Sequence, residues 1–74
     1  MAPDSDLLTI GRAIRRCRSA AKLSQEDLAE RAGLHRNYVG LVERGERNAS
    51  AKTLIAIARA LKTSPATFWS EFRL

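Results

Sequence analysis

The sequence predicts an all-α domain built from five short helices, and three observations support this class. Apolar residues recur at alternating steps of three and four, which places them on one face of a helix. Polar residues able to cap a helix stand before the apolar stretches, and glycines follow two of them. No run with the alternating pattern of a half-buried strand is found.

The length and charge of the chain limit its possible functions. Its 74 residues allow one small domain over 1–74, of which we expect residues 1–4 to be frayed. A domain of this size buries only about 60% of its unfolded surface, so we expect it to form a homodimer. The net charge of +5 favours a polyanionic partner, although many small proteins are basic by chance.

Several classes of protein are disfavoured by composition. No apolar run is long enough to span a bilayer, and Asp4 and Asp6 interrupt any signal-peptide pattern, so a cytoplasmic location is expected. Cys17 and His35 are the single residues of their types and cannot form a structural zinc site or an intrachain disulfide. We therefore expect no metal. No cofactor or small-molecule ligand is expected either, because a single small domain leaves no residues to build a ligand domain. Cys17 is interpreted as a small core residue, with a reactive thiol as the alternative.

The first predicted helix begins at Asp4 or Ser5 and ends near Lys22. Its apolar face consists of Leu7, Ile10, Ile14, Cys17 and Ala21. The opposite face carries several basic residues and is interpreted as solvated.

The stretch from Ser24 to Gly45 predicts two short helices joined by a tight turn. Ser24 is suited to cap the first of them, with Asp27 as the partner in a capping box. Gly33 ends this helix in a left-handed conformation, His35 caps the next, and Gly45 ends it.

The apolar residues of this stretch favour close contact between its two helices. Ala29 is small where the helices must approach, Leu34 fills the corner, and Val39 and Val42 face inward. This pattern suits a crossing of about 90–120°, which is typical of a helix-turn-helix. An ordinary helical hairpin is the alternative.

The last two predicted helices begin at Ser50 and at Ser64-Pro65. The first of them has an apolar face of Leu54, Ile57, Ala58 and Leu61. The second spans about two turns and carries three aromatic residues, more than one inner face can bury. We therefore predict a dimer interface with a two-fold axis, in which Trp69 or Phe72 packs with Ile55. The candidate interface residues are Ile55, Phe68, Trp69 and Phe72.

The central stretch resembles the Cro/repressor (Xre-type) class of DNA-binding domains. The residues that carry the resemblance are Gln25, Leu28, Ala29, Gly33, Leu34, Val39, Val42, Glu43 and Gly45. It implies a compact, five-helix, lambda-repressor-like domain that covers nearly the whole chain. One departure is Lys62-Thr63, where the family usually has a glycine followed by a β-branched apolar residue, and this makes the geometry of that corner less certain.

The resemblance implies that the helix after the turn enters the major groove of double-stranded DNA. Arg36 is then placed to read guanine, Asn37 to read adenine, and Leu41 to contact a thymine methyl. A phosphate contact or plain solvation is the alternative for Arg36. Gly40 either allows close approach to DNA or is a tolerated surface glycine.

The same resemblance assigns residues to the DNA backbone and to the fold. Gln25 corresponds to a family phosphate contact, and Tyr38 is expected to reach the sugar-phosphate, a core role being less favoured. The remaining backbone candidates are Arg47, Asn48 and Lys52. An ion pair between Arg18 and Glu43 is expected to tie the first helix to the recognition helix.

The run from Leu34 to Asn48 is similar to the controller proteins of restriction–modification systems, with an Arg-x-Tyr helix followed by Glu-Arg-Gly-x-Arg-Asn. The expected function is a homodimeric, sequence-specific transcriptional regulator on a near-palindromic operator. The alternative is a protein-interaction module, such as the antitoxin of a toxin–antitoxin pair. An enzyme is disfavoured, because His35 has no evident acidic partner and nucleophile arranged around it.

Overall fold

The computed structural model describes residues 4–72, and the helices in that range follow the predicted order. They are α1 (Ser5–Ala20), α2 (Gln25–Ala32), α3 (Arg36–Glu43), α4 (Ala51–Ala60) and α5 (Pro65–Ser70). The predicted all-α class is therefore confirmed. Of the residues expected to be frayed, 1–3 lie outside the described range, whereas Asp4 caps α1. None of these helices is both long and apolar enough to cross a membrane.

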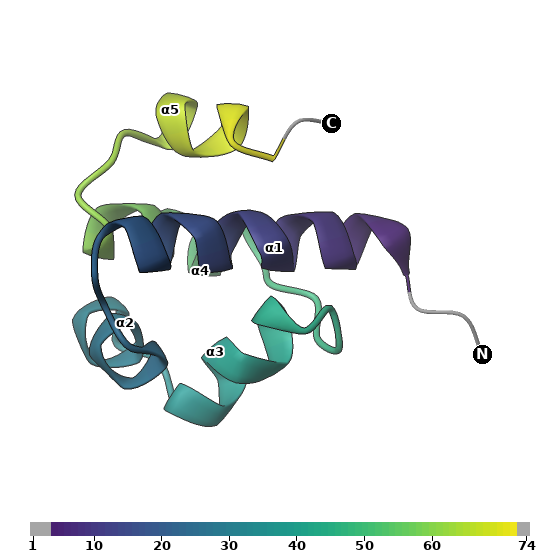
Figure 1. Ribbon diagram of the computed structural model, residues 1–74, viewed down its shortest axis with the longest axis horizontal. Helices are drawn as coiled ribbons and strands as arrows, with labels where there is room; N and C mark the ends of the chain where they lie inside the picture. The colour runs from purple at the N-terminus through teal and green to yellow at the C-terminus, as the bar shows by residue number, and fades with distance from the viewer. Residues whose placement is uncertain (1–3, 73–74) are drawn as a thin grey trace.

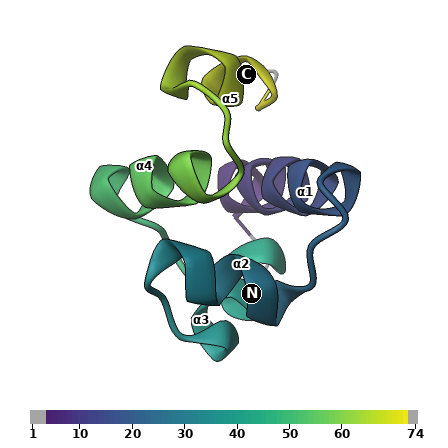
Figure 2. The ribbon, with the colours of Figure 1, turned by 90° about the vertical axis from the view of Figure 1, so that its left-hand side faces the viewer.

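The helices form three levels (Figure 1). In both ribbon views α1 and α4 share the middle level, the α2–α3 pair lies on one side of them, and α5 lies on the other (Figure 2). Consequently α3 and α5 are at opposite ends of the molecule, and a surface on one does not obstruct a surface on the other.

Side-chain caps fix where the helices begin, as the sequence predicted. At α2 the Ser24 hydroxyl accepts a hydrogen bond from the Asp27 N–H at 2.9 Å, and the Asp27 carboxylate accepts one from the Ser24 N–H at 3.0 Å. The hydrogen bond that the Ser24 N–H donates to the carboxylate is the main cause that lowers the pKa of the Asp27 carboxyl. The other capping residues are Asp4, His35, Ser50 and Ser64.

Left-handed residues end the first four helices. Gly33 and Gly45 have φ of 70° and 74°, and Lys22 and Lys62 have φ of 60° and 57°. Lysine in this conformation costs about 1–2 kcal/mol, which glycine avoids. The geometry of the turn at Lys62 is uncertain from the sequence. In the structure Lys62 takes the same left-handed conformation as Gly33 and Gly45. Helix α1 ends at Ala20, slightly before the predicted end, because the left-handed turn at Lys22 follows it.

The core lies between the three levels and takes residues from all five helices. Its largest fully buried side chains are Phe68, Phe72, Ile14, Leu28, Ile57 and Val39. The predicted apolar face of α1 is partly wrong. Ala21 is exposed, whereas Gly11 and Ala13, which the periodicity does not include, are buried. The buried face of α1 is turned toward α3, against which the helix packs.

Gly11 marks the closest approach of α1 to α3. A Cβ atom at this position would lie 2.4 Å from the carbonyl oxygen of Glu43 and 2.5 Å from that of Val42. These are backbone atoms at the end of α3, so they cannot move aside as a flexible side chain would. A residue without a side chain is therefore required for α3 to sit at this distance from α1.

Candidate nucleic-acid interface

The turn between α2 and α3 fixes the direction in which α3 leaves. Gly33 takes the left-handed conformation, and the Leu34 N–H donates to the Ala29 carbonyl at 2.8 Å. The His35 imidazole then accepts a hydrogen bond from the Asn37 N–H at 3.2 Å. As a result α3 begins immediately after the corner, with Arg36 and Asn37 exposed on its first turn.

An open groove of about 670 Å³ runs between the start of α2 and α3. It brings together all four predicted base-reading residues and the predicted phosphate contact Gln25. Its lining consists of Arg18, Ser24, Gln25, Glu26, Arg36, Asn37, Gly40, Leu41 and Arg44. Residues distant in the sequence thus present donors and acceptors on one surface.

Arg36 makes one ionic contact, to Glu26 on α2. The Arg36 Nη1 and Glu26 Oε2 atoms are 3.4 Å apart, and the two side chains are 65% and 70% exposed. A pair this exposed contributes at most about 1 kcal/mol. The Arg36 guanidinium can therefore leave Glu26 for a ligand at little cost.

Gly40 is buried, which argues against the alternative of a tolerated surface glycine. A Cβ atom here would lie 3.1 Å from Nη1 of Arg44 and 3.4 Å from Oε1 of Gln25. The space that a larger residue would fill is thus taken by two side chains of the groove, and the sequence offers no signal for this contact.

Tyr38 and the predicted backbone residues lie on the flanks of α3. The Tyr38 ring is half-buried and packs against the core. The sequence pattern disfavours such a core role, and for the ring this expectation is wrong. Arg47, Asn48 and Lys52 are exposed along the α3–α4 connection and the start of α4. They leave a basic, solvent-facing edge beside α3.

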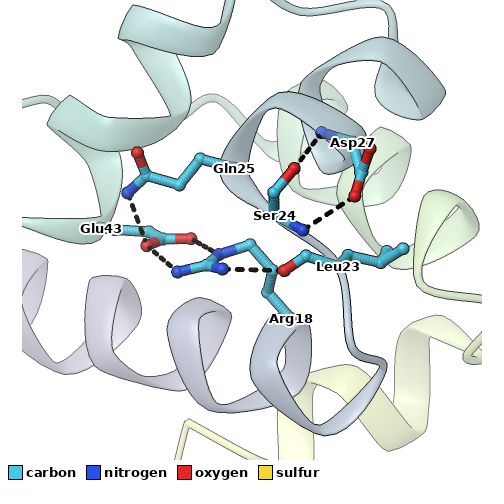
Figure 3. Close-up of polar contacts among 6 residues, drawn as sticks. All are labelled: Arg18, Leu23, Ser24, Gln25, Asp27 and Glu43. Atoms are coloured by element: carbon cyan, nitrogen blue, oxygen red, sulfur yellow. Dashed lines mark hydrogen bonds and ion pairs between the residues drawn. The ribbon is translucent and has the colours of Figure 1, made fainter.

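The predicted pair of Arg18 and Glu43 is present as a two-point ion pair (Figure 3). Arg18 Nε donates to Glu43 Oε2 at 2.6 Å, and Nη2 donates to Oε1 at 3.1 Å. The remaining nitrogen, Nη1, donates to the Leu23 carbonyl at 2.8 Å. The side chains are 14% and 2% exposed, and the hydrogen bond to Glu43 raises the pKa of Arg18. One guanidinium thus connects α1, the α1–α2 loop and the end of α3.

Gln25 joins this network, which sequence reasoning missed. Its Nε2 donates to Glu43 Oε1 at 3.0 Å, from the first residue of α2 to the last residue of α3 (Figure 3). No local pattern connects two residues 18 positions apart. The predicted phosphate contact is therefore held by the same carboxylate as Arg18.

Of the predicted dimer-interface residues, two are buried within the single chain. Phe68 and Phe72 are each 1% exposed and pack edge to face, with ring centroids 5.0 Å apart. Trp69 is 44% exposed and rests edge-on against Phe72, while Ile55 is 37% exposed. The prediction that Phe68 and Phe72 contact a second copy of the chain is therefore wrong, because both rings complete the core of the single chain. Trp69 and Ile55 remain on the surface.

A short helix, a tight glycine turn and a second helix with exposed polar residues on its first turn define a helix-turn-helix. The family model described as helix-turn-helix matches residues 14–68. Control protein C.SmaI of Serratia marcescens is 47% identical over 68 residues, which cover 84% of this chain and 81% of that protein.

Two solved structures have the same fold as this chain. The restriction–modification controller protein C.AhdI from Aeromonas hydrophila is 45% identical, with a TM-score of 0.84 over 88% of this chain and 98% of that one. The controller protein C.Esp1396I, solved as a tetramer with its natural 35-base-pair operator, is 30% identical. Its TM-score is 0.89 over 95% of this chain and 92% of that one.

The chain therefore belongs to the Xre-type helix-turn-helix family and is a DNA-binding transcriptional regulator similar to restriction–modification controller proteins.

Proposed function

We propose that the chain acts as a homodimer on a near-palindromic operator and controls a restriction–modification system. The observation that carries the proposal is the groove between α2 and α3, which places Arg36, Asn37 and Gln25 on one exposed surface. The resemblance to C.SmaI and C.AhdI supports the biological role. The complex of C.Esp1396I with its operator supports binding of such a site.

In this proposal α3 reads bases and its surroundings hold the DNA backbone. Arg36 and Asn37 are directed at base edges in the major groove, with Leu41 one turn further along α3. The backbone contacts come from Gln25, Tyr38, Arg47, Asn48 and Lys52. Two copies of α3 in a dimer would then meet half-sites separated by about 34–36 Å.

Replacing Arg36 by alanine should separate base reading from backbone contact. A bidentate contact to guanine is worth about 1–3 kcal/mol, so Arg36→Ala should lose that much on a duplex selected by the parent protein from a random pool. On unselected duplex the loss should be much smaller. Arg47→Ala should weaken both duplexes alike and reduce the slope of log affinity against log salt by about one per site.

The measurement is fluorescence anisotropy of both labelled duplexes across a salt series, with the parent and both variants. The assignment would be reversed if Arg36→Ala lost the same affinity on both duplexes and Arg47→Ala lost affinity only on the selected duplex. Arg47 would then read bases and Arg36 would contact the backbone.

We place the two-fold axis of the dimer beside Trp69 and Ile55. These are the exposed large apolar side chains in the described part of the chain. Ile55 lies on α4 and Trp69 on α5. Helix α5 is on the other side of the α1–α4 level from α3, which carries the proposed DNA surface (Figure 2). An isologous interface would bury each of them twice, once from each copy.

Replacing Trp69 by alanine should raise the dissociation constant of the dimer. Loss of the exposed part of this ring from both copies should cost about 1.5–2 kcal/mol, or about 10–30-fold. Sedimentation over a range of micromolar concentrations measures it, with Arg15→Ala on the exposed face of α1 as the control. A parent protein that remains monomeric, or a Trp69→Ala dimer as tight as the parent's, would reject this interface.

A further inference from the structure

Gln25 has two neighbours whose arrangement bears on how it would meet DNA. Its amide nitrogen is bonded to Glu43, and its amide oxygen lies beside Gly40. From this arrangement we infer that Glu43 is a positioning residue for DNA binding, which orients the Gln25 amide so that an N–H remains for a phosphate. The inference rests on the proposed function, because it needs Gln25 to face the DNA backbone.

The first step concerns the chemistry of the carboxylate. An ionised glutamate accepts hydrogen bonds and donates none, so it binds the nitrogen end of an amide and repels the oxygen end. Glu43 is held in place by two bonds from Arg18 and its side chain is 2% exposed. The orientation of the Gln25 amide is therefore set by a group that cannot itself reorient.

The second step concerns the donors of the amide. Its nitrogen carries two N–H groups, of which one is engaged by Glu43 at 3.0 Å. The second has no protein partner among the described residues, and the side chain lines the open groove. Figure 3 shows the amide oxygen of Gln25 turned away from Glu43. The second N–H is therefore the group left to donate to a phosphate oxygen.

Gly40 provides an independent observation. A Cβ atom here would lie 3.4 Å from Gln25 Oε1, in van der Waals contact with the amide, and 3.1 Å from Arg44 Nη1. Glycine in the middle of a helix is unfavourable relative to alanine. Its presence leaves space for the amide in the orientation that Glu43 imposes.

The test is a double-mutant cycle on DNA affinity, because a purely structural Glu43 would change stability and leave affinity alone. The proteins are the parent, Gln25→Ala, Glu43→Gln and the double variant, all at 10 °C and low salt. Each is titrated into a duplex selected by the parent from a random pool and into an unselected duplex. Glu30→Gln removes the same charge from an exposed site on α2 and serves as the control.

The expected loss is about tenfold on both duplexes for Gln25→Ala, the value of one hydrogen bond to a charged acceptor. Glu43→Gln should lose about twofold, since its amide tolerates either orientation of Gln25 and only about half of the molecules then keep an N–H toward the phosphate. The double variant should be no weaker than Gln25→Ala alone. Parent-like affinity of Glu43→Gln, or losses that multiply in the double variant, would overturn the inference.

A second variant covers the case in which Glu43→Gln unfolds. Gly40→Ala favours the helix, and its nearest contact is the exposed end of the Arg44 side chain. It should weaken binding at least about threefold when Gln25 is present and not at all in the Gln25→Ala background. Equal losses in both backgrounds would indicate a direct clash with DNA and overturn the inference. If the parent protein bound the selected and the unselected duplex equally tightly, the proposed function would be rejected. The double-mutant cycle could still be measured on either duplex, so the two failures can be told apart.

Discussion

Replacing Arg18 by methionine should lower the free energy of unfolding by about 3–5 kcal/mol, because it leaves an unpaired charge in the interior. Glu43 is 2% exposed and would lose two of its three hydrogen bonds, and the Leu23 carbonyl would lose its side-chain donor. A chain of this length has a total stability of about 4–11 kcal/mol. The variant should therefore lose a large share of its stability, with its melting temperature lowered by more than about 12 °C.

The measurement is thermal and urea unfolding by circular dichroism at one fixed protein concentration, since assembly would also contribute. Arg15→Met, on the exposed face of α1, should stay within about 0.5 kcal/mol of the parent. The double variant Arg18→Met/Glu43→Met should recover part of the loss, because both charges are then gone. Equal melting temperatures for Arg18→Met and Arg15→Met would show that the pair does not tie the helices together.

Replacing Gly11 by alanine should cost about 2 kcal/mol, although alanine is the better helix former. The gain in helix propensity is about 1 kcal/mol. Against it stand two backbone oxygens of α3 that would lie 2.4 and 2.5 Å from the new Cβ atom, a separation that real Cβ atoms do not adopt. Either α3 moves away from α1 or the contact is lost, and overpacking of this kind typically costs about 1–3 kcal/mol before the helix gain is counted, with a clash against backbone atoms at the upper end.

The same unfolding experiment tests this prediction. Arg12→Ala, the next residue along α1 and exposed, gives the effect of alanine on this helix without the clash. If Gly11→Ala unfolds at the same temperature as Arg12→Ala, the close approach of α3 to α1 is not a constraint on the fold.

The helix order and helix starts were predictable because their signals are local. A serine three residues before an acidic partner, as at Ser24 and Asp27, specifies a capping box within one turn of chain. Gly33 and Gly45 likewise identify left-handed helix ends within one residue. The Arg18–Glu43 pair came from the family resemblance, since nothing local links the two positions.

The features that were missed depend on neighbours distant in the sequence. A glycine inside a helix gives no indication of what fills its missing side chain, so Gly11 and Gly40 had no distinguishing signal. The Gln25–Glu43 bond likewise forms only once the turn has brought α2 and α3 together. The burial of Phe68 in α5 and of Phe72 just after it could have been foreseen, because the two residues are four apart and lie on the same side of a helical turn.

The outward position of Trp69 gives the protein an intrinsic optical probe. It is the single tryptophan of the sequence, and it lies on α5, at the opposite end of the molecule from α3. Ultraviolet emission from this indole therefore senses the surroundings of α5, and a shift toward shorter wavelength on concentration would report its removal from water. Assembly and DNA binding can accordingly be followed in one sample. Assembly is reported by the emission of Trp69 in unlabelled protein, and DNA binding by a dye attached to the duplex.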